Sequence, residues 1–206
     1  MSLTIFVLVI LAICVSMTLT EGLWGNTLML FNVIFSAIIA TNYFEPVATK
    51  VTETFPSFTY LWDFLSLWGL FVLSALILRA VTDGISKTKV RFKLPLEQGG
   101  KILCGFLIGW VMVCLFLFSL HVAPLKRSPF GGAFAKSPTS SNFFLSPDML
   151  WLGFMQSRSE NAFATSPANP FDPKSEFVLK YGQRRQKFSK LPKLRVAPAR
   201  RQYASR

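Results

Sequence analysis

Long hydrophobic runs fill about the first 120 residues of the chain, and polar residues collect between and after them. Four runs approach or exceed the length of a membrane span: Ser2 to Thr20, Gly22 to Phe44, Thr54 to Leu78 and Ile102 to Leu120. A single charged residue, Asp63, lies within them. A bilayer core about 30 Å thick needs roughly 20 apolar residues of helix to cross it. The pattern therefore predicts an all-α integral membrane protein with a four-helix transmembrane bundle.

The expected helices cover residues 3–19, 27–44, 61–78 and 102–120. A glycine-containing turn joins the first two, which predicts an antiparallel hairpin. Pro46 is expected to end the second helix, because proline lacks the N–H group that would continue it. Aromatic residues gather around the following loop, a pattern typical of the membrane–water interface.

The first run also has an alternative interpretation, as a cleaved signal peptide. Such signals combine a basic start, an apolar stretch of about 7–15 residues and a small-residue cleavage site. No Lys or Arg precedes this run, the run is longer, and Thr20-Glu21-Gly22 does not form a good site. We therefore expect an uncleaved helix.

Composition changes after the fourth run. The whole chain is 51% hydrophobic with a mean hydropathy of +0.43, yet the segment from Lys126 onward carries 15 Lys or Arg against 4 Asp or Glu. We divide the chain into a membrane domain over residues 1–123 and a Ser/Pro-rich basic tail over 124–206, expected to be mostly disordered. Ser146-Pro147-Asp148 is a helix start signal and predicts a short helix over 147–156.

The end of the tail is strongly basic. From Phe177 onward it has ten basic residues and no acidic residue. Anionic phospholipid headgroups are the nearest partner for such a block. Nucleic acid is not expected, because no recognition fold accompanies the charges. A short repeat at 133–138 and 162–167 (Ala-Phe-Ala-x-Ser-Pro) is either a pair of partner-binding motifs or a product of biased composition.

The loop over residues 79–101 has six basic residues against two acidic ones. Lys87, Lys89, Arg91 and Lys93 stand at every second position, which places them on one side of an extended segment. Two interpretations remain open: binding to an anionic lipid surface, or a solvated loop that only sets topology. Basic loops stay in the cytoplasm, so we expect this loop inside, with the other long loop and both termini outside.

Small residues suggest how the helices pack. Gly105 and Gly109 are four apart on the last expected helix, and this spacing lets another backbone come close. Ser36 and Ala40 give the second helix a similar small face. We expect these two faces to meet within one chain; a homodimer contact is the alternative.

Polar residues within the apolar runs are few. Asp63 lies about two residues into the third expected helix, level with the headgroups, and is either a solvated carboxylate or part of a transport or proton path. Asn32 lies in the middle of the second helix and is expected to hydrogen-bond to a neighbouring helix. His121, just past the fourth run, is expected to be solvated at the interface.

The sequence shows no motif for catalysis, metal binding or nucleotide binding. Cys14, Cys104 and Cys114 all lie inside apolar runs, where we expect them to be packing residues. We therefore predict neither an enzymatic activity nor a cofactor.

The order of these parts resembles the colicin V production protein (CvpA) family over roughly Leu3 to Ala123. Gly22 matches a glycine in the family's first turn, and Leu28 and Leu30 follow it. Gly105, Leu107 and Gly109 match the glycine-spaced start of its last helix. The chain departs from the family's arginines around the first turn and has Glu97-Gln98 where the family tends to have Asp-Arg.

The resemblance implies a non-enzymatic, multi-pass protein of the bacterial inner membrane. Its function would be to support toxin production (a toxin biosynthetic process), toxin export or envelope maintenance by scaffolding membrane-protein partners or copies of itself. The alternative is a small oligomeric transporter or channel. A weaker third hypothesis is a membrane tether whose tail holds a ligand outside the cell.

Overall fold

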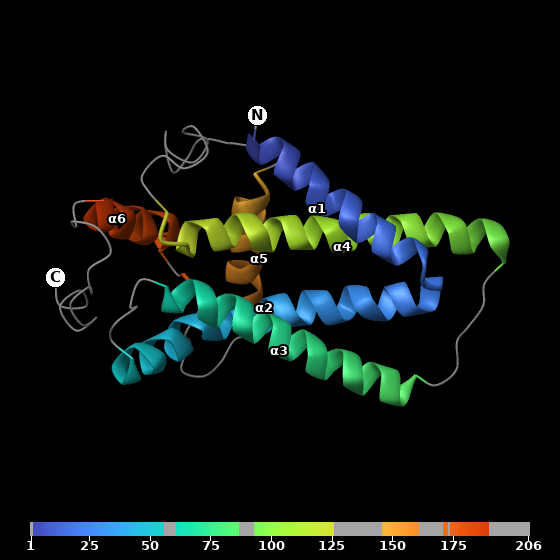
Figure 1. The fold of residues 1–206 in the computed structure, drawn as a ribbon, viewed down its shortest axis with the longest axis horizontal. Coiled ribbons are helices and arrows are strands. Elements are labelled where there is room, and N and C mark those ends of the chain that lie inside the picture. The colour runs from blue at the N-terminus through green and yellow to red at the C-terminus, as the bar shows by residue number, and fades with distance from the viewer. Residues whose placement is uncertain are drawn as a thin grey trace.

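The protein is all helical throughout the described part of a computed structural model, which covers residues 2–55, 61–86, 93–125, 146–160, 171–172 and 174–189 (Figure 1). Its helices are α1 (Ser2–Leu19), α2 (Leu23–Thr54), α3 (Trp62–Ile85), α4 (Leu94–Val122), α5 (Pro147–Glu160) and α6 (Phe177–Ser189). The first four contain the four expected apolar segments.

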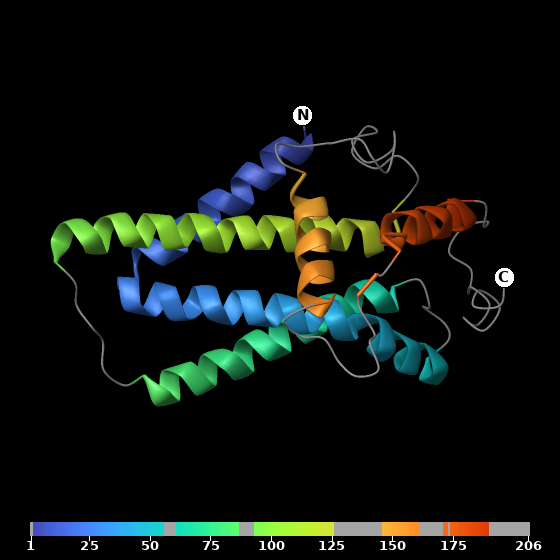
Figure 2. The same ribbon diagram turned by 180° about the vertical axis from the view of Figure 1, so that it is seen from behind.

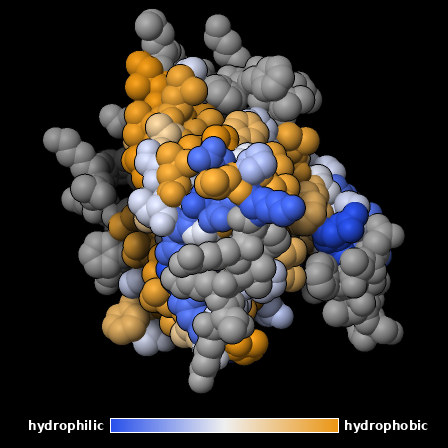
Figure 3. All heavy atoms as spheres, turned by 90° about the vertical axis from the view of Figure 1, so that its right-hand side faces the viewer, coloured by the Kyte–Doolittle hydropathy of each residue, from blue (hydrophilic) through white to orange (hydrophobic). Residues whose placement is uncertain are grey.

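The long helices run back and forth between two ends of the molecule. At one end lie the turn between α1 and α2, the end of α3 and the start of α4 (Figure 1). We call it the turn end. At the other lie the start of α3, the end of α4 and α6 (Figures 1 and 2). We call it the tail end. Seen from the turn end, hydrophilic residues gather on the end face and hydrophobic surface flanks them (Figure 3).

Within the described residues three helices, α2, α3 and α4, are long and apolar enough to cross a membrane. The apolar part of α1 over Thr4–Leu19 is shorter than a full span by the same measure. The chain therefore has the helices of a multi-pass membrane protein, whereas the expected count of four spans is not confirmed.

Packing does not follow the expected hairpin. The helix α1 packs along α4, and α2 packs against both α3 and α4, while α1 and α2 share no extensive contact. The lateral order is thus α1, α4, α2, α3. The short turn reverses the chain as the predicted antiparallel hairpin requires, but it passes α2 to a different neighbour, so the two helices do not pack along each other.

The prediction that Pro46 ends the second helix is also wrong, because α2 continues to Thr54. Proline removes one hydrogen bond and crowds the carbonyl four residues earlier, which bends a helix without necessarily ending it. The last part of α2 does change direction in both ribbon views (Figures 1 and 2). Ala48 and Thr52 beyond the proline are buried, and this packing stabilises the continuation.

The helices α3 and α4 extend beyond their apolar runs. The 29 residues of α4 span about 44 Å at 1.5 Å per residue, which exceeds a bilayer core of about 30 Å. Pro95 stands in its first turn, where proline is favoured. The length of an apolar run predicts only the part of a helix that lies in lipid. It does not predict polar turns that extend the helix into water.

Both tail helices pack onto the membrane domain. Trp151, Leu152 and Met155 of α5 and Phe177 and Tyr181 of α6 are buried in the same hydrophobic cluster as residues of α2, α3 and α4. Since 146–160 and 177–189 are largely helical, the expectation of a mostly disordered tail is not confirmed. These segments lack enough apolar residues for a core of their own, but they share the core of the bundle.

Candidate functional site

Asp63 lies in the first turn of α3 at the tail end, where its side chain is 1% exposed. Arg184 of α6 donates from Nη1 to its Oδ2. The expectation of an Asp63 solvated among headgroups is therefore wrong, because α6 covers it. An ion pair with one member this deeply buried is costly to break, about 3–5 kcal/mol when one partner is removed.

A second carboxylate, Glu45 of α2, holds the same tail helix. Lys180 Nζ lies 2.8 Å from Oε1 and 3.1 Å from Oε2 of Glu45. Tyr181 Oη donates to Glu45 Oε1 at 2.9 Å. We call Glu45 and Asp63 the acidic pair, and we call Lys180, Tyr181 and Arg184 the docking face of α6. Helical spacing of four residues brings Lys180 and Arg184 to the same side of α6.

Tyr181 is the centre of the docking face and is 2% exposed. Its ring centroid lies 5.6 Å from Lys180 Nζ and 5.7 Å from Arg184 Cζ, within the range of cation–π attraction. Burial, followed by the charges of Asp63 and Glu45, raises the pKa of Tyr181 well above its usual value. Its hydroxyl therefore stays protonated and remains a hydrogen-bond donor at neutral pH.

Aromatic packing joins α6 to the bundle beneath these charges. The ring of Phe177 stacks on Phe118 of α4 at 4.9 Å between centroids and lies 4.6 Å from Tyr181. Phe44 of α2 lies edge-on to Phe118 at 6.1 Å. Aromatic pairs at these distances add about 0.5–1.5 kcal/mol each beyond the area they bury.

The helix α5 lies across the long helices (Figures 1 and 2), and polar contacts join it to α4 and α2. His121 Nε2 at the end of α4 lies 2.8 Å from Asp148 Oδ2, and Trp151 Nε1 donates to Thr41 Oγ1 of α2 at 3.0 Å. Burial would raise the pKa of Asp148, but the hydrogen bond and charge of His121 outweigh it and lower the pKa below its usual value. His121 is 4% exposed, so the expectation of a solvated histidine is wrong.

Gly105 and Gly109 face α1. A Cβ at Gly105 would clash with Thr18 Oγ1 and would lie 3.3 Å from Val15 Cα, and one at Gly109 would lie 3.0 Å from Leu11 Cδ2. The two glycines thus permit a close intramolecular approach, but the predicted partner face is wrong. Ser36 and Ala40 are fully buried on α2, whereas the α1 backbone fills the groove over the glycines.

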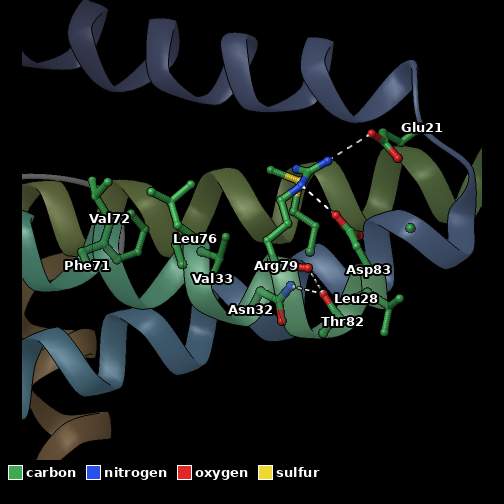
Figure 4. Close-up of a pocket in the computed structure, with 13 residues that line it drawn as sticks. Glu21, Leu28, Asn32, Val33, Phe71, Val72, Leu76, Arg79, Thr82 and Asp83 are labelled. Carbon is green, nitrogen blue, oxygen red and sulfur yellow. Dashed lines mark hydrogen bonds and ion pairs between the residues drawn. The ribbon is translucent and has the colours of Figure 1, made fainter. Parts of the chain in front are cut away.

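Asn32 contacts a neighbouring helix as expected. Its Nδ2 donates to Thr82 Oγ1 of α3 at 2.9 Å, and Thr82 Oγ1 in turn donates to the carbonyl of Arg79. This contact lies in a groove of about 240 Å³ between α2 and α3 (Figure 4). Arg79 stands at the turn end of the groove between Glu21 and Asp83, and Phe71 stands at its other end.

Of the predicted basic loop, Lys87, Lys89 and Arg91 lie outside the described residues. Lys93 is the N-cap residue of α4 and is exposed. Among the described residues, no three His, Cys, Asp or Glu side chains gather as metal ligands would. The structure brings the acidic pair and α6 together, and it places Asn32 and the glycines elsewhere in the bundle.

Sequence reasoning missed Arg184 as a partner of Asp63, and it missed the contacts of Glu45 with Lys180 and Tyr181. In the sequence, Lys180 and Arg184 were interpreted only as part of the basic tail, and Glu45 only as the first residue of a loop. The one available signal is the Lys180-Tyr181-Arg184 spacing on a helix that also carries Phe177. That pattern indicates an amphipathic basic helix, but it does not identify where the helix docks.

The family model for the colicin V production protein matches residues 3–145. A search of curated proteins found no match, and neither did a search of solved structures. The match covers all four long helices and ends just before α5, so the docked tail helices lie beyond it. Because the match spans more than half of the chain, this membrane protein belongs to the colicin V production protein family.

Proposed function

We propose that this chain is a non-enzymatic scaffold of the bacterial inner membrane that supports toxin production, toxin export or envelope maintenance by holding partner proteins. The observation that carries the proposal is the docking of α6 on the acidic pair. Contacts at Glu45, Asp63 and His121 hold the two tail helices in fixed positions at one end of the bundle. A fixed helix with exposed residues such as Gln183, outside the docking face, presents a defined surface to a partner.

The alternative, a small oligomeric transporter or channel, has less support. A conductive path is expected to carry polar or charged groups within the membrane. In the described spans Asp63 is engaged by Arg184, and Asn32 donates to Thr82. The groove between α2 and α3 is lined mostly by apolar side chains away from its turn end.

The proposed orientation places the turn end in the cytoplasm and the tail end outside. The six basic residues between 79 and 101 support it, because short basic loops stay in the cytoplasm. Anionic headgroups are the proposed partner of the basic residues at 87–93, and a homo-oligomer is a proposed assembly. A cysteine at position 87 should then react with a membrane-impermeant reagent only after the inner face is opened.

The scaffold proposal is tested by photo-crosslinking in native membranes from position 183, which is exposed on α6. The full-length chain should form a discrete crosslinked species with another membrane protein. Arg184→Glu should remove that species because it places a carboxylate against Asp63. Lys174→Glu makes the same charge change at an exposed residue outside α6 and should leave it intact.

An ion-flux assay distinguishes the scaffold from the transporter or channel. The purified full-length chain is placed in vesicles loaded with an ion-sensitive dye. Scaffolding predicts no flux above that of protein-free vesicles, together with the crosslink. Flux that Asp63→Asn abolishes, in the absence of any crosslinked partner, would replace the scaffold with the transporter.

A further inference from the structure

The groove between α2 and α3 lies away from the docked tail, in the half of the bundle toward the turn end. Its inner part is lined by apolar residues of both helices, among them Val33, Phe71, Val72 and Leu76 (Figure 4). Val72 and Leu76 are 50% and 63% exposed, so the groove is open along one side of α3. In a membrane this open side faces the acyl chains of the bilayer.

The charges on α3 indicate the depth of the groove. Asp63 and Asp83 stand 20 positions apart, which corresponds to about 30 Å of helix, the thickness of a bilayer core. Arg79 and Asp83 therefore reach the headgroup level of one leaflet when Asp63 reaches that of the other. Phe71 is eight residues from both Asp63 and Arg79, so it lies about 12 Å deeper than Arg79, near the bilayer centre. The groove thus runs from headgroup depth toward the bilayer centre.

The mouth of the groove carries one cation between two anions. Arg79 Nη2 lies 3.5 Å from Glu21 Oε1, and Arg79 Nε lies 3.6 Å from Asp83 Oδ2. These separations exceed the 2.7–2.9 Å of a charge-assisted hydrogen bond. The three side chains are 54%, 44% and 68% exposed. The guanidinium has five donors and is half exposed, so it can still engage a phosphate beside the two carboxylates.

We propose that this groove binds one phospholipid with a zwitterionic phosphate–ammonium head, of the phosphatidylethanolamine class. Arg79 contacts the phosphate, and Glu21 and Asp83 receive the ammonium group. One acyl chain lies along Val33, Phe71, Val72 and Leu76. The site joins the turn before α2 to the end of α3, so the bound lipid fills the space where these two helices diverge.

The charge balance of the mouth selects this head over an anionic one. Glu21, Arg79 and Asp83 together carry a formal charge of −1. A phosphatidylglycerol head supplies a phosphate but no cation, and it would leave both carboxylates facing a negative group. A phosphoethanolamine head supplies both signs at the spacing of neighbouring side chains. The site is therefore distinct from the basic residues proposed to bind anionic headgroups.

The test measures which lipid stays with the full-length protein. The chain is reconstituted in bilayer discs that contain equal amounts of phosphatidylethanolamine and phosphatidylglycerol, and the retained lipid is identified by native mass spectrometry after release. We expect phosphatidylethanolamine to be retained in preference to phosphatidylglycerol. Arg79→Gln should lower its retention about fivefold, the effect of one partly exposed ion pair. Equal retention of both lipids by the unchanged protein would overturn the head-group assignment.

A pair of variants on α3 tests the groove itself. Ala75→Phe fills the groove, because Ala75 lines it, and should lower lipid retention about tenfold. Ala80→Phe adds the same side chain at an exposed position of α3 that does not line the groove and should retain the lipid. Equal retention by the two variants would overturn the acyl-chain site. If Ala75→Phe fails to accumulate, the Arg79→Gln result decides, and unchanged retention there overturns the proposal.

Discussion

The two ends of the bundle contain the same kind of ion pair in opposite surroundings. At the tail end Arg184 pairs with Asp63, and their side chains are 22% and 1% exposed. At the turn end Arg79 stands between Glu21 and Asp83, and all three side chains are about half exposed or more. Only the tail-end pair forms a direct hydrogen bond. The two ion pairs therefore differ in burial: the buried Arg184–Asp63 pair stabilises the fold, whereas the exposed Arg79 keeps its N–H donors accessible.

The difference follows from what covers each end. At the tail end α6 covers Asp63, whose side chain is 1% exposed, and a low local dielectric strengthens attraction while making an unpaired charge costly. No described aromatic residue of the tail covers Arg79. The tail end is thus expected to be sensitive to single substitutions, whereas the turn end is expected to tolerate them.

The largest effect is expected from breaking the buried pair. Arg184→Met leaves the Asp63 carboxylate buried without this cation and should lower the free energy of unfolding by about 3–5 kcal/mol. Chemical unfolding in detergent, followed by the protection of α6 from protease, measures it. The double variant Asp63→Asn with Arg184→Met should recover much of the loss. A loss below 1 kcal/mol would mean that α6 does not cover Asp63 in the membrane.

Close packing at the glycines should give the next effect. Gly105→Ala introduces a Cβ against Thr18 and the α1 backbone and should destabilise by about 1–3 kcal/mol, the range found for overpacking. Gly99→Ala, in the same helix with open space around it, should be neutral or stabilise by about 0.5–1 kcal/mol. Melting of the two variants side by side measures the difference. If both behave alike, α1 does not pack on this face of α4.

The docking of α5 should depend on acid pH. The pKa of Asp148 is lowered in the folded state, so its contribution is present above the ordinary carboxyl pKa of about 3.9 and is lost as the pH falls through the lowered value. Hydrogen-exchange protection of α5 should hold at pH 5 and decline toward pH 2. Asp148→Asn should weaken the protection at pH 5 and remove its dependence on acid. A variant that keeps the wild-type profile would exclude Asp148 as the titrating group.

The smallest effect on stability is expected at the turn end. Arg79→Gln removes two long, exposed ion pairs and should change the free energy of unfolding by less than about 1 kcal/mol. The same unfolding assay compares it directly with Arg184→Met. A loss comparable to that of Arg184→Met would show that the stability of the two ends depends equally on their charges.

The sequence by itself determined the class of protein and the apolar centres of its long helices. In lipid every backbone N–H and C=O must be satisfied within the chain, so long apolar stretches such as residues 27–44 or 102–120 have helix as their natural structure. The same reasoning could not locate the helix ends. The helix α2 continues past Pro46 because the residues after the proline are packed, and α3 and α4 extend into the polar residues around Ile85 and Leu94, where water can hydrogen-bond to the exposed backbone. The matched family was likewise predicted from the order of these parts.

Only the tertiary structure decided which side chains meet. Arg184 and Asp63 are 121 positions apart, and Trp151 and Thr41 are 110 apart, so no periodicity relates them. The glycines at 105 and 109 predicted a close approach, because a missing Cβ is a local property of one helix. Their partner on α1 depended on how all the helices share one core, since several small faces could fill the same groove. The local sequence pattern indicates which face of each helix can be buried. Which neighbouring helix covers that face depends on how all the helices pack together.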